Sequence, residues 1–172
     1  MKSIMVIIGT RPEAIKMAPL VLKLKEEENI KTIVCSTGQH REILEQVLSF
    51  FGIAPDINLD IMKENQDLFS ITSSIMNSLK KSFEEFNPDL ILVHGDTTTA
   101  FSASLAAFYA RIKIGHVEAG LRTWNLKSPF PEEFNRQSIG KIANYHFSPT
   151  VKSEENLKVE GIAAKNILTT GN

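Results

Sequence analysis

Acidic side chains are the residues of this sequence best placed to do chemistry. Asp96 and Glu118 each follow a short apolar run, and Glu132 follows Pro131 at the expected start of a helix. Carboxylates near a reacting centre can move protons or stabilise developing positive charge. Glu118 caps no obvious helix, so its position after an apolar run favours a functional role. The sequence therefore predicts a group of acids that acts on a bound substrate.

Each of these acids also has a structural explanation. Asp96 would serve as the N-cap of the helix expected at Thr97–Ala110. Glu132 or its neighbour Glu133 would be favoured at a helix start by the helix dipole alone. Trp124 either stacks on a sugar or base or covers its own loop, and the sequence leaves both open.

Basic side chains lie in the same turns and loops. Arg11 and Lys16, near a helix N-terminus, could face a phosphorylated ligand, and Arg122 and Arg136 are expected near the acids. The commoner explanation of the first pair is a capped helix with surface cations. The first turn lacks the G-x-G-x-x-G pattern, which counts against a nicotinamide dinucleotide site.

Short apolar strands alternate with helices, which predicts an α/β fold with a doubly wound parallel sheet. The expected strands are Met5–Ile8, Lys31–Ser36, Ile53–Met62, Leu90–Val93, Lys113–Val117, His146–Phe147 and Ile167–Thr170. The expected helices run from Thr10 toward Glu28 and over Arg41–Phe51, Asp67–Phe86, Thr97–Ala110, Glu132–Asn144 and Ser153–Glu160.

Two features of this pattern bear on the site. The carboxyl ends of parallel strands share one edge, so Asp96 and Glu118 should emerge on the same rim, where such sheets bind ligands. The loop Leu121–Pro131 is irregular and long, as functional loops tend to be. Pro19 should kink or break the first helix.

The composition bounds the class of protein. The 172 residues are 42% hydrophobic and 23% charged, with a net charge of -1, which fits one globular domain and argues against a nucleic-acid partner. No run is long enough to span a membrane, so no membrane association is expected. The single cysteine, Cys35, indicates a reducing compartment, and we expect a cytoplasmic protein. The last strand runs into Gly171-Asn172, which suggests a piece of a longer chain.

Four segments together resemble one enzyme family. They are GTRPEAIKMAP (9–19), HGDTTT (94–99), GHVEAGLRT (115–123) and SPFPEE (128–133), the last followed by Asn135-Arg136. In register they closely resemble the non-hydrolysing UDP-N-acetylglucosamine 2-epimerases. The resemblance implies a Rossmann-like fold over 1–172, the N-terminal half of a two-domain glycosyltransferase-B arrangement. It places a UDP-binding domain and a catalytic histidine outside this chain.

Members of that family interconvert UDP-GlcNAc and UDP-ManNAc, for cell-surface polysaccharides. UDP is eliminated to give 2-acetamidoglucal and is then re-added. The resemblance implies catalytic roles for Asp96, Glu118 and Glu132 and substrate contacts by Arg11, Lys16 and Arg136. It implies no metal or other cofactor, a homodimeric full-length protein, and an inactive fragment.

The resemblance also raises regulation and two other functions. Some bacterial members bind UDP-GlcNAc as an activator through a Gln-His pair, matched here by Gln39 and His40. An arginine that those members also use corresponds to Asn65 here, so allosteric control stays open. The alternative functions are a hydrolysing epimerase that releases ManNAc and a sugar-nucleotide-binding domain without catalysis.

Overall fold

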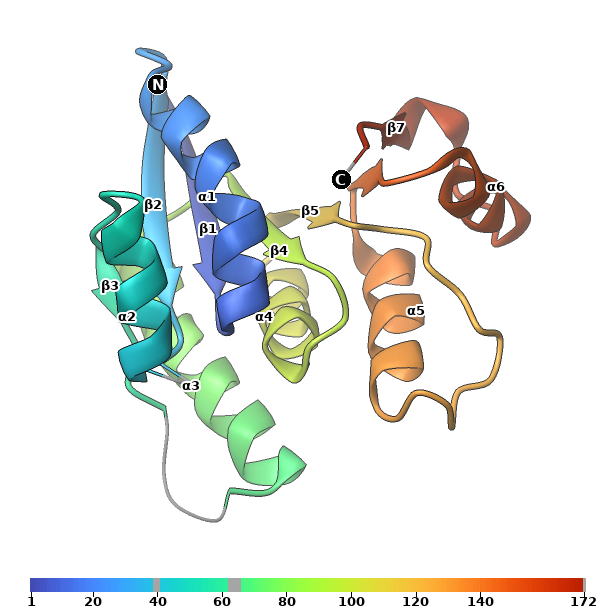
Figure 1. Ribbon diagram of the computed structural model, residues 1–172, viewed down its shortest axis with the longest axis horizontal. Helices are drawn as coiled ribbons and strands as arrows, with labels where there is room; N and C mark the ends of the chain where they lie inside the picture. Colours follow the sequence, from blue (N-terminus) through green and yellow to red (C-terminus); the bar gives the residue numbers. More distant parts are fainter. Residues whose placement is uncertain (39–40, 62–65, 172) are drawn as a thin grey trace.

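A parallel sheet with helices on both faces forms the protein, as seen in a computed structural model that describes residues 1–38, 41–61 and 66–171 (Figure 1). The strands follow the order β3-β2-β1-β4-β5-β6-β7, and every pair is parallel. Their bounds are β1 Lys2–Ile8, β2 Ile30–Ser36, β3 Ile57–Asn58, β4 Leu90–His94, β5 Lys113–Val117, β6 Tyr145–Ser148 and β7 Ile167–Thr169. The predicted Rossmann-like α/β class is confirmed.

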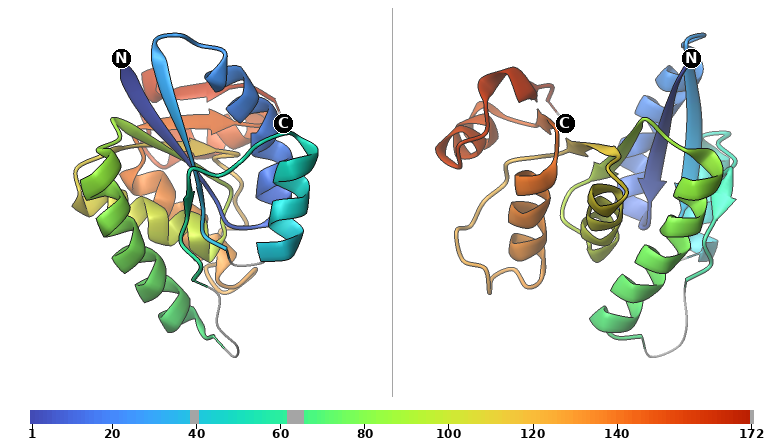
Figure 2. Two further views of the ribbon diagram at one scale, coloured as in Figure 1. Left: turned by 90° about the vertical axis from the view of Figure 1, so that its left-hand side faces the viewer. Right: turned by 180° about the vertical axis from the view of Figure 1, so that it is seen from behind.

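The helices are α1 Arg11–Lys25, α2 Arg41–Phe50, α3 Leu68–Phe86, α4 Thr98–Tyr109, α5 Glu132–Ile142 and α6 Val151–Val159, with a short 3-10 turn, η1, at Ala164–Asn166. Figure 2 shows α1 and α2 on one side of the sheet and α3 and α4 on the other. Among the described residues, no helix is long and apolar enough to cross a membrane.

Strand alternation divides the core into two layers. Met5 and Ile7 of β1 pack with α3, α4 and α5, whereas Val6 and Ile8 pack with α1 and α2. Successive side chains of a strand point to opposite faces, so an uninterrupted apolar strand requires helices on both sides. The apolar runs noted in the sequence reflect this double burial.

Two expected elements differ in the structure. The helix α1 continues through Pro19 without a break. Both Pro19 and Ile15 lie on its exposed face, so water can reach the Ile15 carbonyl that loses its partner. Of the strand expected at Ile53–Met62, only Ile57–Asn58 pairs with β2, and Met62 lies outside the described residues.

The order in which successive strands join the sheet changes direction at the boundary between β1 and β4. From β1 the sheet grows through β2 to β3 on one side and through β4 to β7 on the other. Open α/β sheets bind ligands at the carboxyl edge of such a switch point. The turns that follow β1 and β4 are therefore the first place to look for a site.

Candidate active site

Hydrogen bonding between neighbouring strands brings Asp96 and Glu118 to the same rim. His94 of β4 pairs with Val117 of β5, and the Gly95 amide donates to the Val117 carbonyl over 2.9 Å. Both acids therefore follow directly where these strands end. The negative charges of Glu132 and Glu118 both act to raise the pKa of Asp96, so each of them lies within electrostatic reach of Asp96.

Glu118 lies between two basic groups. Its Oε2 contacts the ammonium of Lys16 and is 3.5 Å from Nε2 of His94, which is buried. These partners, His94 first, lower the pKa of Glu118 to about 2 against the opposing effect of burial. Oε1 has no hydrogen-bond donor among the residues that the structure describes. Glu118 is thus an anion with one oxygen that no described residue engages.

The backbone at Glu118 is in the left-handed region, with φ of +62°. Residues other than glycine adopt this conformation at a cost of about 1 kcal/mol or more, and such residues gather at functional sites. This conformation turns the side chain from the end of β5 toward α1, where Lys16 lies.

Asp96 is not the N-cap of α4, and that interpretation of the sequence is wrong. Thr97 takes the role, since its hydroxyl oxygen accepts from the Ala100 amide over 3.0 Å. Asp96 instead places Oδ2 3.1 Å from Nη1 of Arg136, and no described residue donates to its Oδ1. Burial is the largest influence on the pKa of Asp96 and raises it, while Arg136 opposes that rise.

The neighbours Glu132 and Glu133 have different surroundings. Glu132 is the first residue of α5 and is partly buried. Glu133 is fully buried and accepts from the amides of Thr123 and Trp124 over 3.0 and 2.9 Å. Glu133 is therefore explained by structure, which leaves Glu132 as the acid directed to the site.

The cations predicted to lie near the acids occupy different positions. Lys16 contacts Glu118 and Arg136 contacts Asp96, as described above. Arg11 is exposed at the start of α1. Arg122 pairs instead with Glu160, through Nε at 2.7 Å and Nη2 at 2.9 Å, and its side chain is fully buried. Arg122 is thus a packing residue that joins the loop after β5 to α6.

The N-terminus of α1 is occupied by one of its own side chains. Oε2 of Glu13 accepts from the amides of Gly9 and Thr10 over 2.6 and 2.8 Å, as expected of the capping box. Oε1 of the same acid accepts from the Thr97 hydroxyl over 2.6 Å. Those two amides are therefore engaged by Glu13 and are not available to a ligand.

Gly9 serves contact between elements. A β-carbon at this position would lie 2.4 Å from Oγ1 of Thr99, so only glycine lets the β1–α1 turn approach α4 so closely.

Three buried residues of the site were not among the predicted site residues. His94 contacts Glu118, Glu133 binds Arg136, and His116 donates a hydrogen bond from Nε2 to the Gly95 carbonyl, 2.7 Å away. The motif HGD at residues 94–96 indicated a role for His94. Nothing in the sequence marks His116, whose partner is a backbone carbonyl, whereas the three-residue spacing of Glu133 and Arg136 could have predicted their pairing on one helix. Gln39 and His40, the predicted activator pair, lie outside the described residues.

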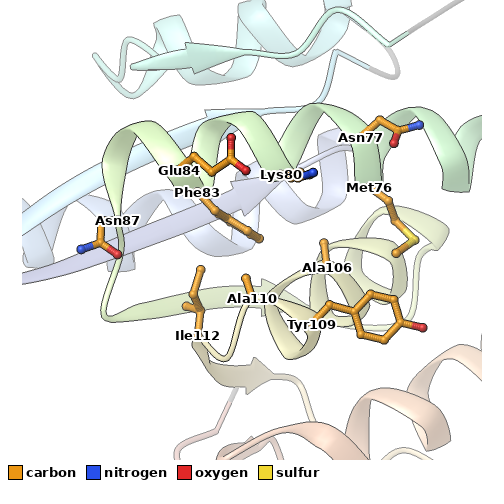
Figure 3. A pocket seen from close by; sticks show the side chains of 10 residues that line it. All are labelled: Met76, Asn77, Lys80, Phe83, Glu84, Asn87, Ala106, Tyr109, Ala110 and Ile112. Carbon is orange, nitrogen blue, oxygen red and sulfur yellow. The ribbon is translucent and has the colours of Figure 1, made fainter.

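A cavity of about 530 Å³ lies elsewhere, between α3 and α4 (Figure 3). Phe83 and Ile112 enter it from opposite sides, and Tyr109 lies at its edge. None of the predicted catalytic or substrate-binding residues lines this cavity. The rim of the sheet remains the place where titratable side chains converge.

Comparison with known proteins identifies the family of this chain. Residues 22–172 match the family model described as UDP-N-acetylglucosamine 2-epimerase. An enzyme of that name from Bacillus subtilis is 56% identical over 169 residues, which are 98% of this chain and 44% of the relative. The chain thus spans about half the length of the curated relatives it matches.

Solved structures give the same result. The UDP-GlcNAc 2-epimerase of Neisseria meningitidis bound to UDP-GlcNAc matches with a TM-score of 0.96 and 55% identity, over 100% of this chain and 46% of that one. The Methanocaldococcus jannaschii enzyme, in complex with UDP-GlcNAc and UDP, matches with a TM-score of 0.92 and 32% identity, over 99% of this chain and 46% of that one.

Proposed function

Because the chain belongs to the UDP-N-acetylglucosamine 2-epimerase family, we propose that it is the N-terminal half of an enzyme that interconverts UDP-GlcNAc and UDP-ManNAc. The observation that carries this proposal is the position of Asp96 and Glu118 directly after the neighbouring strands β4 and β5, with Glu132 close enough to influence the charge of Asp96. A second domain, which would hold most of the UDP contacts, would complete the site opposite this rim.

The proposed reaction explains why several acids are needed. The C2 proton of the sugar is not adjacent to a carbonyl, so a base cannot readily remove it from the ground state. When the C1–O bond to UDP breaks, positive charge develops at the ring and the C2 proton becomes acidic. Its loss gives 2-acetamidoglucal. Addition of UDP at C1 and of a proton to the other face of C2 gives the epimer.

The surroundings of the acids suit different roles in this sequence. Glu118 stays ionised, since His94 and Lys16 hold its pKa at about 2, and its free Oε1 can face the cationic ring. Burial raises the pKa of Asp96 above its ordinary value, which favours a role in proton transfer. We assign charge stabilisation to Glu118 and proton transfer to Asp96, with Glu132 near the latter.

The cations fit the same scheme. Arg11 is exposed beside the turn after β1 and is placed to meet a diphosphate. Lys16 contacts Glu118 and can exchange part of this contact for a substrate oxygen. Both remain assigned to substrate contact.

Incubation of the full-length enzyme with UDP-GlcNAc in deuterated water tests the proposal. Deuterium at C2 of both UDP-GlcNAc and UDP-ManNAc is the expected result, because the proton is exchanged with solvent during epimerisation. Release of free ManNAc would instead identify a hydrolysing enzyme. Binding of UDP-GlcNAc without any turnover would identify a sugar-nucleotide-binding protein.

A further inference from the structure

Glu133 is the most completely engaged acid at the rim, although it does not face the site. Its side chain has no exposed surface. It accepts from the amides of Thr123 and Trp124, from Nε2 of Gln137 over 2.7 Å, and from the guanidinium of Arg136. A carboxylate that receives several donors in the interior is held in one position.

These contacts tie two parts of the chain together. Thr123 and Trp124 lie in the loop that leads from β5 to the N-terminus of α5, and this loop runs beside α5 in Figure 1. Glu133, Arg136 and Gln137 belong to the first two turns of α5. Glu133 therefore fixes the loop to the helix and fixes the Arg136 side chain at the same time.

Arg136 connects Glu133 to Asp96. Its guanidinium is largely buried, contacts Glu133 through Nη2, and reaches Oδ2 of Asp96 through Nη1 at 3.1 Å. The neighbouring Asn135 donates from Nδ2 to the Asp96 carbonyl over 2.9 Å. Both the backbone and the carboxylate of Asp96 are thus held by α5.

We propose that Glu133 and Arg136 are positioning residues that fix the orientation and the charge of the Asp96 carboxylate. The catalytic importance of this arrangement rests on the proposed epimerase function. Arg136, which the family resemblance assigns to substrate contact, acts through Asp96 instead, because its donors are directed at the buried carboxylate of Glu133 and the partly exposed carboxylate of Asp96.

The charges around Asp96 predict the direction in which each substitution should shift its pKa. Glu132 and Glu118 face Asp96 and disfavour its ionised form, whereas Arg136 favours it. Lys16 and His94 act on Glu118. Glu133 shares the positive charge of Arg136 and so weakens its effect on Asp96. Loss of the cation should raise the pKa of Asp96, and loss of the Glu133 charge should lower it.

Titration of the Asp96 carboxyl by carbon NMR in this chain measures these shifts directly, with the signal assigned through Asp96→Asn. Arg136→Gln should move the titration to higher pH, Glu133→Gln should move it to lower pH, and Arg136→Lys should leave it close to the original. Arg122→Gln is the matched control, since it removes a buried guanidinium that pairs with Glu160. It should leave the titration in place, even if the chain is less stable.

The full-length enzyme provides the second readout. Glu133→Gln and Arg136→Gln should each lower kcat by about tenfold or more with little change in KM, because they displace an acting group rather than remove a substrate contact. The pH profile of kcat should move in the two opposite directions given above. Arg136→Lys should recover part of kcat.

An Asp96 titration that Arg136→Gln leaves unmoved, or that Arg122→Gln moves equally, would overturn the proposal. If Arg136→Gln does not fold, Glu133→Gln decides: a shift to lower pH supports the proposal and no shift overturns it. If the full-length protein shows no epimerisation, the proposed function fails, yet the NMR titration still tests whether Glu133 and Arg136 govern Asp96.

Discussion

His116 allows a quantitative prediction of how stability depends on pH. The ring is completely buried in β5, and its Nε2 lies 2.7 Å from the carbonyl of Gly95, one residue before Asp96. Burial is the main cause that lowers the pKa of His116 to about 3, and the charges of His146, Arg122 and His94 add to it. The ring is therefore neutral at physiological pH and donates from Nε2 to this carbonyl.

The magnitude follows from the difference in proton affinity between the folded and unfolded states. Unfolding restores the ordinary pKa of 6.5, so His116 of the unfolded chain becomes protonated below pH 6.5. In the folded chain the same ring becomes protonated only near pH 3. Above pH 6.5 the group contributes no pH dependence, and stability falls as the pH drops below it. Between pH 7 and pH 5 this single residue should cost about 2 kcal/mol of unfolding free energy.

Urea unfolding followed by circular dichroism at pH 7 and pH 5 checks this value in the wild type and in His116→Gln. Glutamine can still donate to the Gly95 carbonyl but cannot titrate, so the variant should lose about 2 kcal/mol less than wild type between the two pH values. Other titrating groups, His146 among them, act in both proteins and cancel in the difference. Equal losses would show that His116 does not bear the depressed pKa, and the reasoning about its tautomer would fail with it.

Three further predictions concern the acids and their supports. Asp96→Asn and Glu118→Gln should each reduce kcat of the full-length enzyme at least tenfold, about 1.4 kcal/mol of barrier, as measured by UDP-ManNAc formation. Glu155→Gln, at an exposed helix position, is the control, and a smaller loss in both site variants would refute the roles assigned to them. The 172-residue chain alone should not epimerise UDP-GlcNAc, and detectable product from the purified chain would contradict the need for a second domain. Thr97→Ala should lower the unfolding free energy by about 1–2 kcal/mol through loss of the α4 cap, whereas Thr97→Ser should stay near wild type. Equal stability of these two variants in urea unfolding would contradict the role of Thr97 as the cap.

The fold was predictable because the apolar runs of the strands depend on a local pattern. Leu90–Val93 and Lys113–Val117 were expected as strands, and β4 and β5 cover them with one added residue at most. The helices Arg41–Phe51 and Asp67–Phe86 were also expected, and α2 and α3 match them to within one residue at each end. These features need no knowledge of distant neighbours.

The site was less predictable because its geometry depends on contacts between distant segments. Arg122 was grouped with the acids since it follows Glu118 closely in sequence, yet it pairs with Glu160 of the α6 end. Asp96 had two candidate roles, and only the Thr97 cap separates them. For Arg122 the partner is too distant in sequence for a local pattern to identify it. For the α4 cap, Asp96 and Thr97 are equally suitable residue types.

The phase of a helix decides which of two adjacent acids is structural. Successive helical residues point about 100° apart, so Glu132 and Glu133 cannot face the same partners. Glu133 points inward to two loop amides, while Glu132 remains partly exposed near Asp96.

Glu13, which follows the turn after β1, is another acid whose oxygens are engaged by donors of the protein. Its two oxygens accept from Gly9, Thr10 and Thr97, so it joins the turn after β1 to the start of α4. Acids saturated by such donors have no oxygen left for a ligand. Asp96 and Glu118 each keep one carboxylate oxygen without a donor from the described residues. The number of donors at each oxygen, which no sequence pattern reveals, therefore separates the acids that shape this rim from those that can act on a substrate.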